Sequence, residues 1–327
     1  MIVTLADNAD VDHVRRELTG LGLWLEGLEG SDHGPVQLVV GPGSVAVIDA
    51  ALLAVRGVAA VSRAKSRHPR VDQQASRLKI GAHEFGGALP TVIAGPCAVE
   101  SEEQIARIAA ALARRGVRVL RGGAFKPRTS PYDFQGCGKN ALRWLRRAAD
   151  AEGMSVVTEV MSERDLDAVA AVADLLQIGS RNMQNFALLE AVGRSGKPVL
   201  LKRAMAATVD EWLSAAEYLL VHGASDVVFC ERGLRGFDRS TRNLLDLGAV
   251  ALLAQVHGLP VIADPSHAAG RRELILPLAR AALAAGAQGV MIEVHDDPAS
   301  ARSDGAQALA PEALDGLMTE LRPAGVG

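Results

Sequence analysis

A short apolar run, a turn and an Ala/Leu-rich helical segment recur eight times after residue 90, and this repeat constrains the fold most strongly. The runs are Thr91–Ala94, Val117–Leu120, Ser155–Thr158, Leu175–Ile178, Val199–Leu201, Val227–Cys230, Val261–Ala263 and Gly289–Ile292. Eight strand–helix units over about 240 residues predict an α/β fold, a (β/α)₈ TIM barrel. A doubly wound open sheet fits less well, because neither a Gly-rich nucleotide turn nor a break in the repeat is visible.

The N-terminal residues carry a different pattern, with four short strand signals and two helical ones. The signals in chain order are Ile2–Leu5, Asp10–Leu21, Leu23–Leu28, Val36–Val40, a helix from an N-cap at Ser44 through Val55, and Val58–Ser62. The order βαββαβ predicts a ferredoxin-like α+β module. We therefore expect a ferredoxin-like regulatory domain over 1–63, a linker over 64–76 and the barrel over 77–327, with a hairpin at Leu78–Phe85.

Composition excludes several classes of protein. The 327 residues carry a formal net charge of −3, which implies no general affinity for nucleic acid or an anionic membrane. Aromatic residues make up 3% of the chain, too few for base stacking along a nucleic acid. No apolar stretch approaches the length of a membrane span. The three cysteines and the absence of a secretory signal at the N-terminus predict a reduced, cytoplasmic protein.

The stretch Arg121–Gly136 follows the second apolar run and reads R-G-G-A-F-K-P-R-T-S-P-Y-D-F-Q-G. Its glycines and prolines prevent regular structure, so a shaped loop is expected. Guanidinium groups, an ammonium group and hydroxyls on such a loop suit phosphate and carboxylate oxygens. A solvated basic loop is the simpler alternative.

Chemically versatile side chains follow the runs, at the positions that a barrel gathers at its C-terminal mouth. Cys97, His267, Glu293 and Asp304 would form a mixed S/N/O set that suits Mn²⁺, Fe²⁺, Zn²⁺ or Co²⁺. Cys97 alone would more simply be a buried apolar residue, and His267 alone a hydrogen-bonded core residue. Together the four favour a metal site, whereas Cys137 and Cys230 are expected to be structural.

A second set of strand-end residues is cationic. Its members are Arg121, Lys126, Arg128, Arg181, Lys202 and Arg232. Gathered at one mouth they would repel one another unless the ligands bring several negative charges. Surface salt bridges are the alternative for these residues, and the interpretation that we adopt for Arg235, Arg239 and Arg242.

Eight motifs, taken together, resemble 3-deoxy-D-arabino-heptulosonate 7-phosphate (DAHP) synthases, of the single-barrel microbial type with an N-terminal ferredoxin-like extension. The motifs are G-P-C-A-V-E-S, R-G-G-A-F-K-P-R-T-S-P-Y-D-F-Q-G, Q-I-G-S-R-N-M-Q-N, L-L-K-R, E-R-G-L-R, D-P-S-H-A-A-G, M-I-E-V-H and S-D-G-A-Q-A-L. The resemblance runs from about residue 65 to the C-terminus. It implies condensation of phosphoenolpyruvate with erythrose 4-phosphate, the first step of the shikimate pathway to aromatic amino acids.

The resemblance also implies roles for individual residues. Cys97, His267, Glu293 and Asp304 would bind the metal, with Mn²⁺ expected first. The residues for phosphoenolpyruvate would be Arg121, Lys126, Arg181, Lys202 and Arg232, with the backbone at Ser180. Those for erythrose 4-phosphate would be Arg128, Thr129 and Ser130. Lys126, Glu159 and His267 would act in catalysis, Lys126 on the new alkoxide and Glu159 on the attacking water.

Partners and rival functions follow from the same resemblance. A tyrosine or phenylalanine effector, homotetramers or homodimers, and no nucleic acid or membrane partner are expected. The nearest rival is the related synthase of 3-deoxy-D-manno-octulosonate 8-phosphate, which uses arabinose 5-phosphate. Its opening motif resembles K-A-N-R-S, where this chain has Lys126-Pro127-Arg128-Thr129-Ser130. A barrel that only binds a phosphorylated effector, without catalysis, is a further alternative.

Overall fold

The structure is a computed structural model, and it describes residues 1–29, 35–41, 44–45, 47–62, 66–126, 130 and 132–321. The chain forms two compact units, Met1–Arg67 and His68–Gly327. Each unit has its own apolar core. Within the described residues, no helix combines the length and the apolar composition that crossing a membrane requires.

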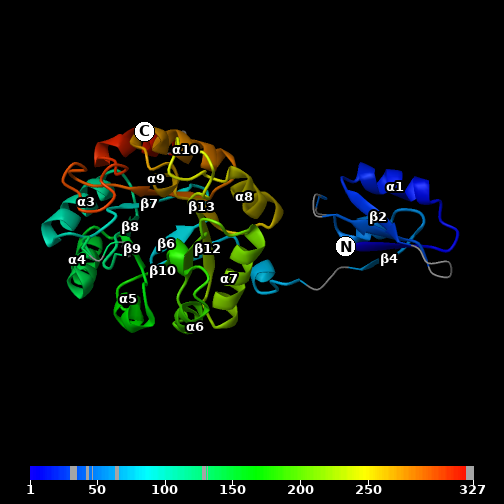
Figure 1. The fold of residues 1–327 in the computed structure, drawn as a ribbon, viewed down its shortest axis with the longest axis horizontal. Coiled ribbons are helices and arrows are strands. Elements are labelled where there is room, and N and C mark those ends of the chain that lie inside the picture. The colour runs from blue at the N-terminus through cyan, green and yellow to red at the C-terminus, as the bar shows by residue number, and fades with distance from the viewer. Residues whose placement is uncertain are drawn as a thin grey trace. The chain divides into compact units, whose positions relative to one another are not determined.

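The second unit is a closed barrel of eight parallel strands, which confirms the predicted fold (Figure 1). The strands are β7 (Thr91–Gly95), β8 (Val119–Arg121), β9 (Ser155–Glu159), β10 (Leu175–Ile178), β11 (Val199–Lys202), β12 (Val227–Glu231), β13 (Val261–Ala263) and β14 (Gly289–Glu293). β14 pairs with β7 and closes the ring. Each predicted apolar run is therefore a barrel strand, and several strands extend one residue further, to a charged side chain.

Helices surround the strands and cover their outer faces (Figure 1). They are α3 (Glu102–Arg114), α4 (Gly138–Ala151), α5 (Leu166–Ala170), α6 (Phe186–Arg194), α7 (Val209–Val221), α8 (Leu247–Ala251), α9 (Pro265–Ala269), α10 (Arg272–Ala284) and α11 (Asp315–Glu320). Short 3₁₀ turns cover Val71–Gln73, Glu163–Asp165, Ser180–Asn182 and Pro311–Leu314, and a π-helical turn, Leu252–Val256, extends α8.

The N-terminal caps of α3 and α7 differ in how many of their hydrogen bonds are formed. At α7 the capping box is complete, because Thr208 Oγ1 accepts from the Glu211 amide and the Glu211 carboxylate accepts from the Thr208 amide. At α3, Ser101 Oγ accepts from the Gln104 amide, but the Gln104 side chain accepts from the Glu100 amide instead. The box at α3 is therefore only half formed.

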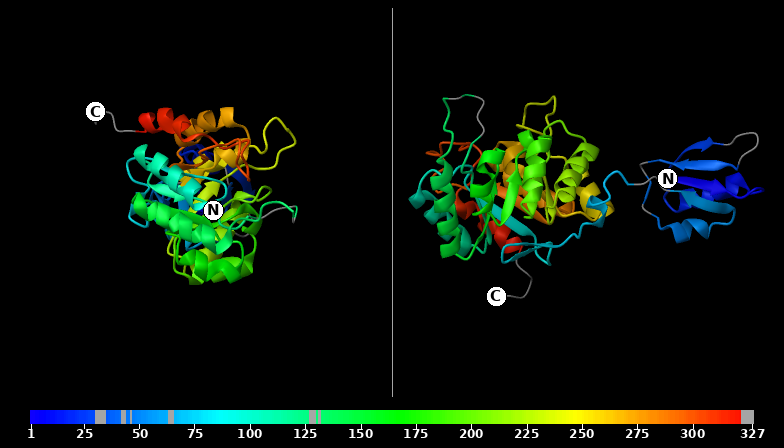
Figure 2. Two further views of the ribbon diagram at one scale, coloured as in Figure 1. Left: turned by 90° about the vertical axis from the view of Figure 1, so that its left-hand side faces the viewer. Right: turned by 90° about the horizontal axis from the view of Figure 1, so that it is seen from below.

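The end of the barrel where the strands begin is closed by a hairpin, β5 (Leu78–Ile80) and β6 (His83–Phe85), as predicted. Leu78, Ile80 and Phe85 join the apolar side chains inside the barrel, and Ser155 Oγ donates to the Ile80 carbonyl at 2.6 Å. In the right-hand view of Figure 2 the loop after β12 extends from the opposite end. We call the hairpin end the floor and the other end the mouth.

Part of the stretch expected as a linker contacts the barrel. The amides of Arg70 and Val71 donate to the Glu217 carboxylate of α7 at 3.0–3.1 Å. The Gln74 side chain exchanges two hydrogen bonds with the backbone of Val227, the first residue of β12. These bonds attach residues 70–74 to the barrel unit.

The first unit is a four-stranded antiparallel sheet in the order β2-β3-β1-β4, with two helices. Its elements are β1 (Ile2–Leu5), α1 (Val11–Gly20), β2 (Leu25–Glu29), β3 (Gln37–Val40), α2 (Asp49–Leu53) and β4 (Val58–Ser62). Val3, Leu5, Val14, Leu18 and Leu52 are among the residues of its core. The regulatory, ferredoxin-like identity of this unit stays a prediction.

The predicted N-cap at Ser44 is wrong. Helix α2 begins at Asp49, and its N-cap position, Ile48, makes no side-chain hydrogen bond. Ser44 Oγ instead accepts from the Trp24 amide at 2.7 Å, just before β2. The hydroxyl satisfies a backbone donor twenty residues away, a pairing that local helix signals do not contain.

Candidate active site

Four potential metal ligands meet at the mouth of the barrel. Cys97 follows β7, His267 lies in the first turn of α9, Glu293 ends β14, and Asp304 lies in the loop beyond β14. One ligand atom from each lies within 4.8 Å of the other three. The barrel thus brings together side chains that are up to 207 residues apart, as the sequence predicts for strand ends.

Hydrogen bonds fix the orientation of these four side chains. His267 Nδ1 lies 2.7 Å from Asp264 Oδ2, and His267 Nε2 lies 3.2 Å from Glu293 Oε1. A proton on Nδ1 that is donated to Asp264 leaves Nε2 as the ligand nitrogen. Cys97 Sγ lies 3.1 Å from Asp304 Oδ2.

Burial and charge set the protonation of the group. The pKa of the Cys97 thiol is raised to about 12, mainly by burial and secondly by the negative charge of Glu293. Burial also lowers the pKa of His267, although Asp264 and Glu293 oppose this change, and the lowered pKa favours the neutral imidazole. Burial alone would raise the pKa of Glu293, but His267 and Arg121 hold it below its usual value.

The chemistry of these donors fits a divalent ion. A neutral imidazole nitrogen and an ionised carboxylate are ready to coordinate, and a thiol loses its proton when a cation binds it. A donor set with one sulfur, one nitrogen and carboxylate oxygens suits borderline ions such as Mn²⁺, Fe²⁺, Co²⁺ or Zn²⁺. The types of donor atom and their closeness therefore support a metal-binding site at the mouth.

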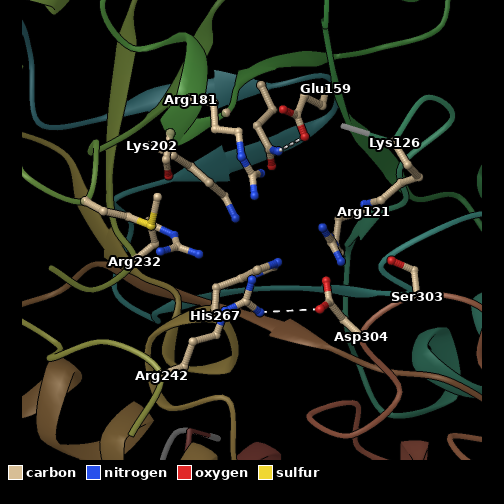
Figure 3. A pocket seen from close by; sticks show the side chains of 14 residues that line it. Arg121, Lys126, Glu159, Arg181, Lys202, Arg232, Arg242, His267, Ser303 and Asp304 are labelled. Carbon is tan, nitrogen blue, oxygen red and sulfur yellow. Dashed lines mark hydrogen bonds and ion pairs between the residues drawn. The ribbon is translucent and has the colours of Figure 1, made fainter. Parts of the chain in front are cut away.

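A cavity beside this group is lined by cations, whose side chains converge on one space in Figure 3. The cationic residues that line it are Arg121, Lys126, Arg181, Lys202, Arg232 and Arg242. Such a concentration of positive charge suits a small ligand with several negative charges.

The cations differ in how they are paired. Arg121 is buried and donates to Glu293 Oε1 at 2.9 Å and to the Pro96 carbonyl at 3.0 Å. Lys126 Nζ lies 3.0 Å from Cys97 Sγ. Lys202 pairs with Asp264, the acid that also contacts His267.

Arg232 lacks a full set of hydrogen-bond partners among the residues that the structure describes. Its side chain is buried, and within the described residues its Nη1 is one of three buried side-chain atoms with no hydrogen-bond partner. Burial lowers the pKa of Arg232, which means that burial disfavours its charge. An unsatisfied buried donor that lines a cavity is available to an anion that enters there.

Two predicted polar groups also line the cavity, Glu159 and Ser180. Glu159 Oε2 accepts from Gln177 Nε2 at 3.2 Å. A side chain at residue 179 would collide with this carboxylate, because a Cβ on Gly179 would lie 2.0 Å from Glu159 Oε1. Glycine at residue 179 therefore lets Glu159 reach the mouth.

The remaining predicted residues belong to the loop after β8. Arg128 and Thr129 lie outside the described residues. Ser130 is half-buried, and its Oγ accepts from the Tyr132 amide at 3.3 Å. Ser130 is not among the residues that line the cavity.

Several lining residues were not predicted from the sequence. Gln177 lies inside a buried strand, and a polar residue within an apolar run is a signal that could have identified it. Ser303, which precedes Asp304, contacts Cys97 Sγ at 3.2 Å. Arg242 was assigned to surface salt bridges, but it lines the cavity and pairs with Asp304. No local pattern distinguishes Arg242 from its neighbours Arg235 and Arg239.

Comparison with known proteins relates this site to one family. A family model described as the DAHP synthetase I family matches residues 72–324. A phospho-2-dehydro-3-deoxyheptonate aldolase of Thermotoga maritima is 49% identical over 245 residues, which cover 75% of this chain and 72% of the relative. A 2-dehydro-3-deoxyphosphooctonate aldolase of Magnetococcus marinus is 34% identical over 258 residues, covering 73% and 88%.

Solved structures agree with the sequence comparison. The crystal structure of the DAHP synthase of Thermotoga maritima aligns with a TM-score of 0.75 and 40% identity, over 98% of this chain and 95% of that one. A truncated form of that organism's enzyme aligns with a TM-score of 0.70 and 45% identity, over 76% of this chain and 91% of that one.

Proposed function

Because the chain belongs to the DAHP synthetase I family, we propose that it condenses phosphoenolpyruvate with erythrose 4-phosphate to DAHP and phosphate. This reaction is the first step of the shikimate pathway. The observation that carries the proposal is the cation-lined cavity directly beside the thiol, imidazole and carboxylate group. Two phosphorylated substrates, one of them also a carboxylate, bring the negative charge that such a cavity needs.

Phosphoenolpyruvate is assigned to Arg121, Lys126, Arg181, Lys202 and Arg232, with the backbone amide near Ser180. Arg232 supports this assignment, because its unpaired Nη1 can donate to a phosphate oxygen without giving up another partner. Arg121 keeps one fixed geometry through Glu293 and Pro96, which leaves the rest of its guanidinium for the ligand. Arg128, Thr129 and Ser130 are assigned to erythrose 4-phosphate.

The metal is assigned to Cys97, His267, Glu293 and Asp304, with Mn²⁺ preferred and Fe²⁺, Zn²⁺ or Co²⁺ as alternatives. A divalent ion held there would supply Lewis-acid polarisation of the aldehyde oxygen. The chain's own contribution is orientation: Asp264 holds the imidazole of His267, and Lys202 holds Asp264.

The bonds change in a defined order in the proposed reaction. The methylene carbon of phosphoenolpyruvate bonds to the aldehyde carbon with the π electron pair of its own double bond, which breaks. The π pair of the aldehyde moves to the aldehyde oxygen, which then takes a proton from Lys126. Water oriented by Glu159 adds to the carbon that carries the phosphate and loses a proton. The carbon–oxygen bond to phosphate then breaks and phosphate leaves with the electron pair. The hydroxyl that came from water gives up its remaining proton, and a ketone is left.

The remaining assignments concern regulation and assembly. We assign the binding of tyrosine or phenylalanine as an effector to the N-terminal unit, a homotetramer or homodimer to the assembly, and the cytoplasm as the location. No nucleic acid or membrane partner is assigned. These assignments rest on the family resemblance.

The test is a paired assay with phosphoenolpyruvate and Mn²⁺, with erythrose 4-phosphate in one arm and arabinose 5-phosphate in the other. Each arm runs with and without EDTA, and loss of the enol absorbance and release of phosphate are followed. We expect EDTA-sensitive turnover with erythrose 4-phosphate alone. Turnover with arabinose 5-phosphate alone would assign the chain to the related octulosonate synthase. No turnover with either sugar phosphate, although the metal is bound, would favour an effector-binding barrel.

A further inference from the structure

We propose that Arg242 is a positioning residue that connects the elements carrying His267, Glu293 and Asp304 and holds the two carboxylates for the metal. Arg242 lies in the loop between β12 and α8, far in sequence from all three residues. The proposal rests on the metal group described above and adds a residue that orients it.

The backbone of Arg242 is attached to the helix that carries His267. The amides of Arg242 and Asn243 donate to the carbonyls of Ala269 and Ala268 at 3.0 and 2.8 Å. The side-chain amide of Asn243 donates to the carbonyl of His267 at 3.1 Å. The loop is therefore tied to α9 itself.

Glycine at residue 270 permits this close approach. Gly270 ends α9 with a φ of 64°, and a Cβ there would lie 2.8 Å from the Cβ of Arg242. A larger residue would push the loop away from α9. The position of Arg242 is thus built into the packing of the two segments.

The side chain of Arg242 reaches the two carboxylates by separate routes. Its Nη1 donates to Asp304 Oδ1 at 3.3 Å and to Gln307 Oε1 at 3.1 Å. The Nε2 of Gln307 in turn donates to Glu293 Oε2. Figure 3 shows Arg242 and Asp304 facing each other at the edge of the cavity. One guanidinium thereby sets the orientation of Asp304 directly and of Glu293 through Gln307.

The backbone of Asp304 explains why this support is needed. Asp304 has a φ of 54° and is the one non-glycine residue with positive φ in the part of the chain that the structure describes. A non-glycine residue with positive φ has a strained backbone, and this conformation persists when the surrounding contacts hold it. The contacts of Asp304 with Arg242 and Cys97, and of its carbonyl with the Gln307 amide, supply that restraint.

Charge alone predicts the opposite effect of Arg242 on metal binding. A guanidinium repels a nearby cation, so removing it should tighten metal binding if electrostatics dominated. The Arg242 side chain is 41% exposed and that of Asp304 28%, so solvent screens the pair and weakens it. A loss of metal affinity after removal of Arg242 would therefore report lost orientation.

The experiment titrates Co²⁺ into the full-length, metal-free protein and follows the thiolate-to-cobalt absorption band. Arg242→Met should weaken Co²⁺ binding by roughly 10- to 100-fold and change the band, as expected for loss of a group that orients ligands. Arg242→Lys, which keeps the charge, should fall between wild type and Arg242→Met. Gln307→Met should weaken binding, and the double variant should lose less than the product of the two single losses, since both act through one network.

The matched control is Arg239→Met, an exposed arginine of the same loop, which should bind Co²⁺ like wild type. Circular dichroism checks the fold of each variant, and Arg242→Lys provides the test if Arg242→Met does not fold. Co²⁺ binding by Arg242→Met or Arg242→Lys as tight as that of wild type, with the same band, would overturn the positioning role. Absence of a thiolate band in wild type would instead overturn the proposed metal group, and the inference with it.

Discussion

The two ends of the barrel are built from the same eight strands and differ sharply in chemistry. At the floor, Ile93, Val119 and Val157 pack with the hairpin residues Ile80 and Phe85 in an apolar cluster. At the mouth, the same strands lead to buried charges, which are costly to bury unless they are paired. The floor therefore contributes stability, and the mouth carries the charges that the reaction needs.

Two buried cysteines make the contrast specific. Cys97 at the mouth contacts Lys126, Ser303 and Asp304, whereas Cys230 belongs to the apolar cluster inside the barrel. Burial raises the pKa of both thiols. Burial alone thus does not distinguish a ligand from a core residue, but the neighbouring polar groups do.

The largest effect is expected for Cys97→Ala, which removes a ligand from the mouth. We expect kcat/KM to fall at least roughly 1,000-fold, equivalent to about 4 kcal/mol of transition-state stabilisation. Steady-state assays with Mn²⁺ measure the loss, and circular dichroism should show an unchanged fold. As the control, Cys230→Ala should keep the activity and lose about 1 kcal/mol of stability. Full activity of Cys97→Ala would remove Cys97 from the metal site.

Phe85→Ala tests the floor. Phe85 is fully buried under the barrel, so its truncation should lower the free energy of unfolding by about 3–5 kcal/mol. Denaturant unfolding measures this change. KM values measured at denaturant concentrations below the unfolding transition should stay close to those of wild type, because the mouth lies at the other end of the strands. A large change in KM would mean that the two ends are coupled.

Arg232→Met should separate binding from stability at the mouth. Loss of a charge-assisted hydrogen bond to phosphate should raise KM for phosphoenolpyruvate roughly 10- to 100-fold. Since Nη1 has no partner among the described residues, the free energy of unfolding should not fall and should rise by up to about 3 kcal/mol. Kinetics and thermal unfolding of the same preparation measure both quantities. A marked loss of stability would indicate that Arg232 is a structural residue.

Thr208→Ala gives the smallest effect and tests whether nearness to the mouth implies function. Thr208 caps α7, which follows β11 and so begins on the mouth side. Loss of the cap should cost about 1 kcal/mol of stability. Thermal unfolding measures this cost, and kcat and KM should not change. A drop in kcat would show that the start of α7 contributes to the site.

Much of the site was predictable because a parallel barrel gathers its strand ends at one face. Cys97, His267 and Glu293 are assigned from their positions after apolar runs, although up to 196 residues separate them (293 − 97). Gln177 and Arg242 were missed for different reasons. Gln177 lies inside a strand, and Arg242 lies in a loop whose course no periodic pattern describes.

The order of elements follows from the sequence, since hydrophobic periodicity and caps are local properties of the chain. They are sufficient for eight strands, their helices and the hairpin at the floor. The pairing of charges is not local. Lys202 and Arg203 are neighbours, yet Lys202 pairs with Asp264 at the mouth, while Arg203 pairs with Glu231 and Asp246. Such partners depend on distances of a few ångströms between segments far apart in the chain, and these distances arise only when the barrel has closed.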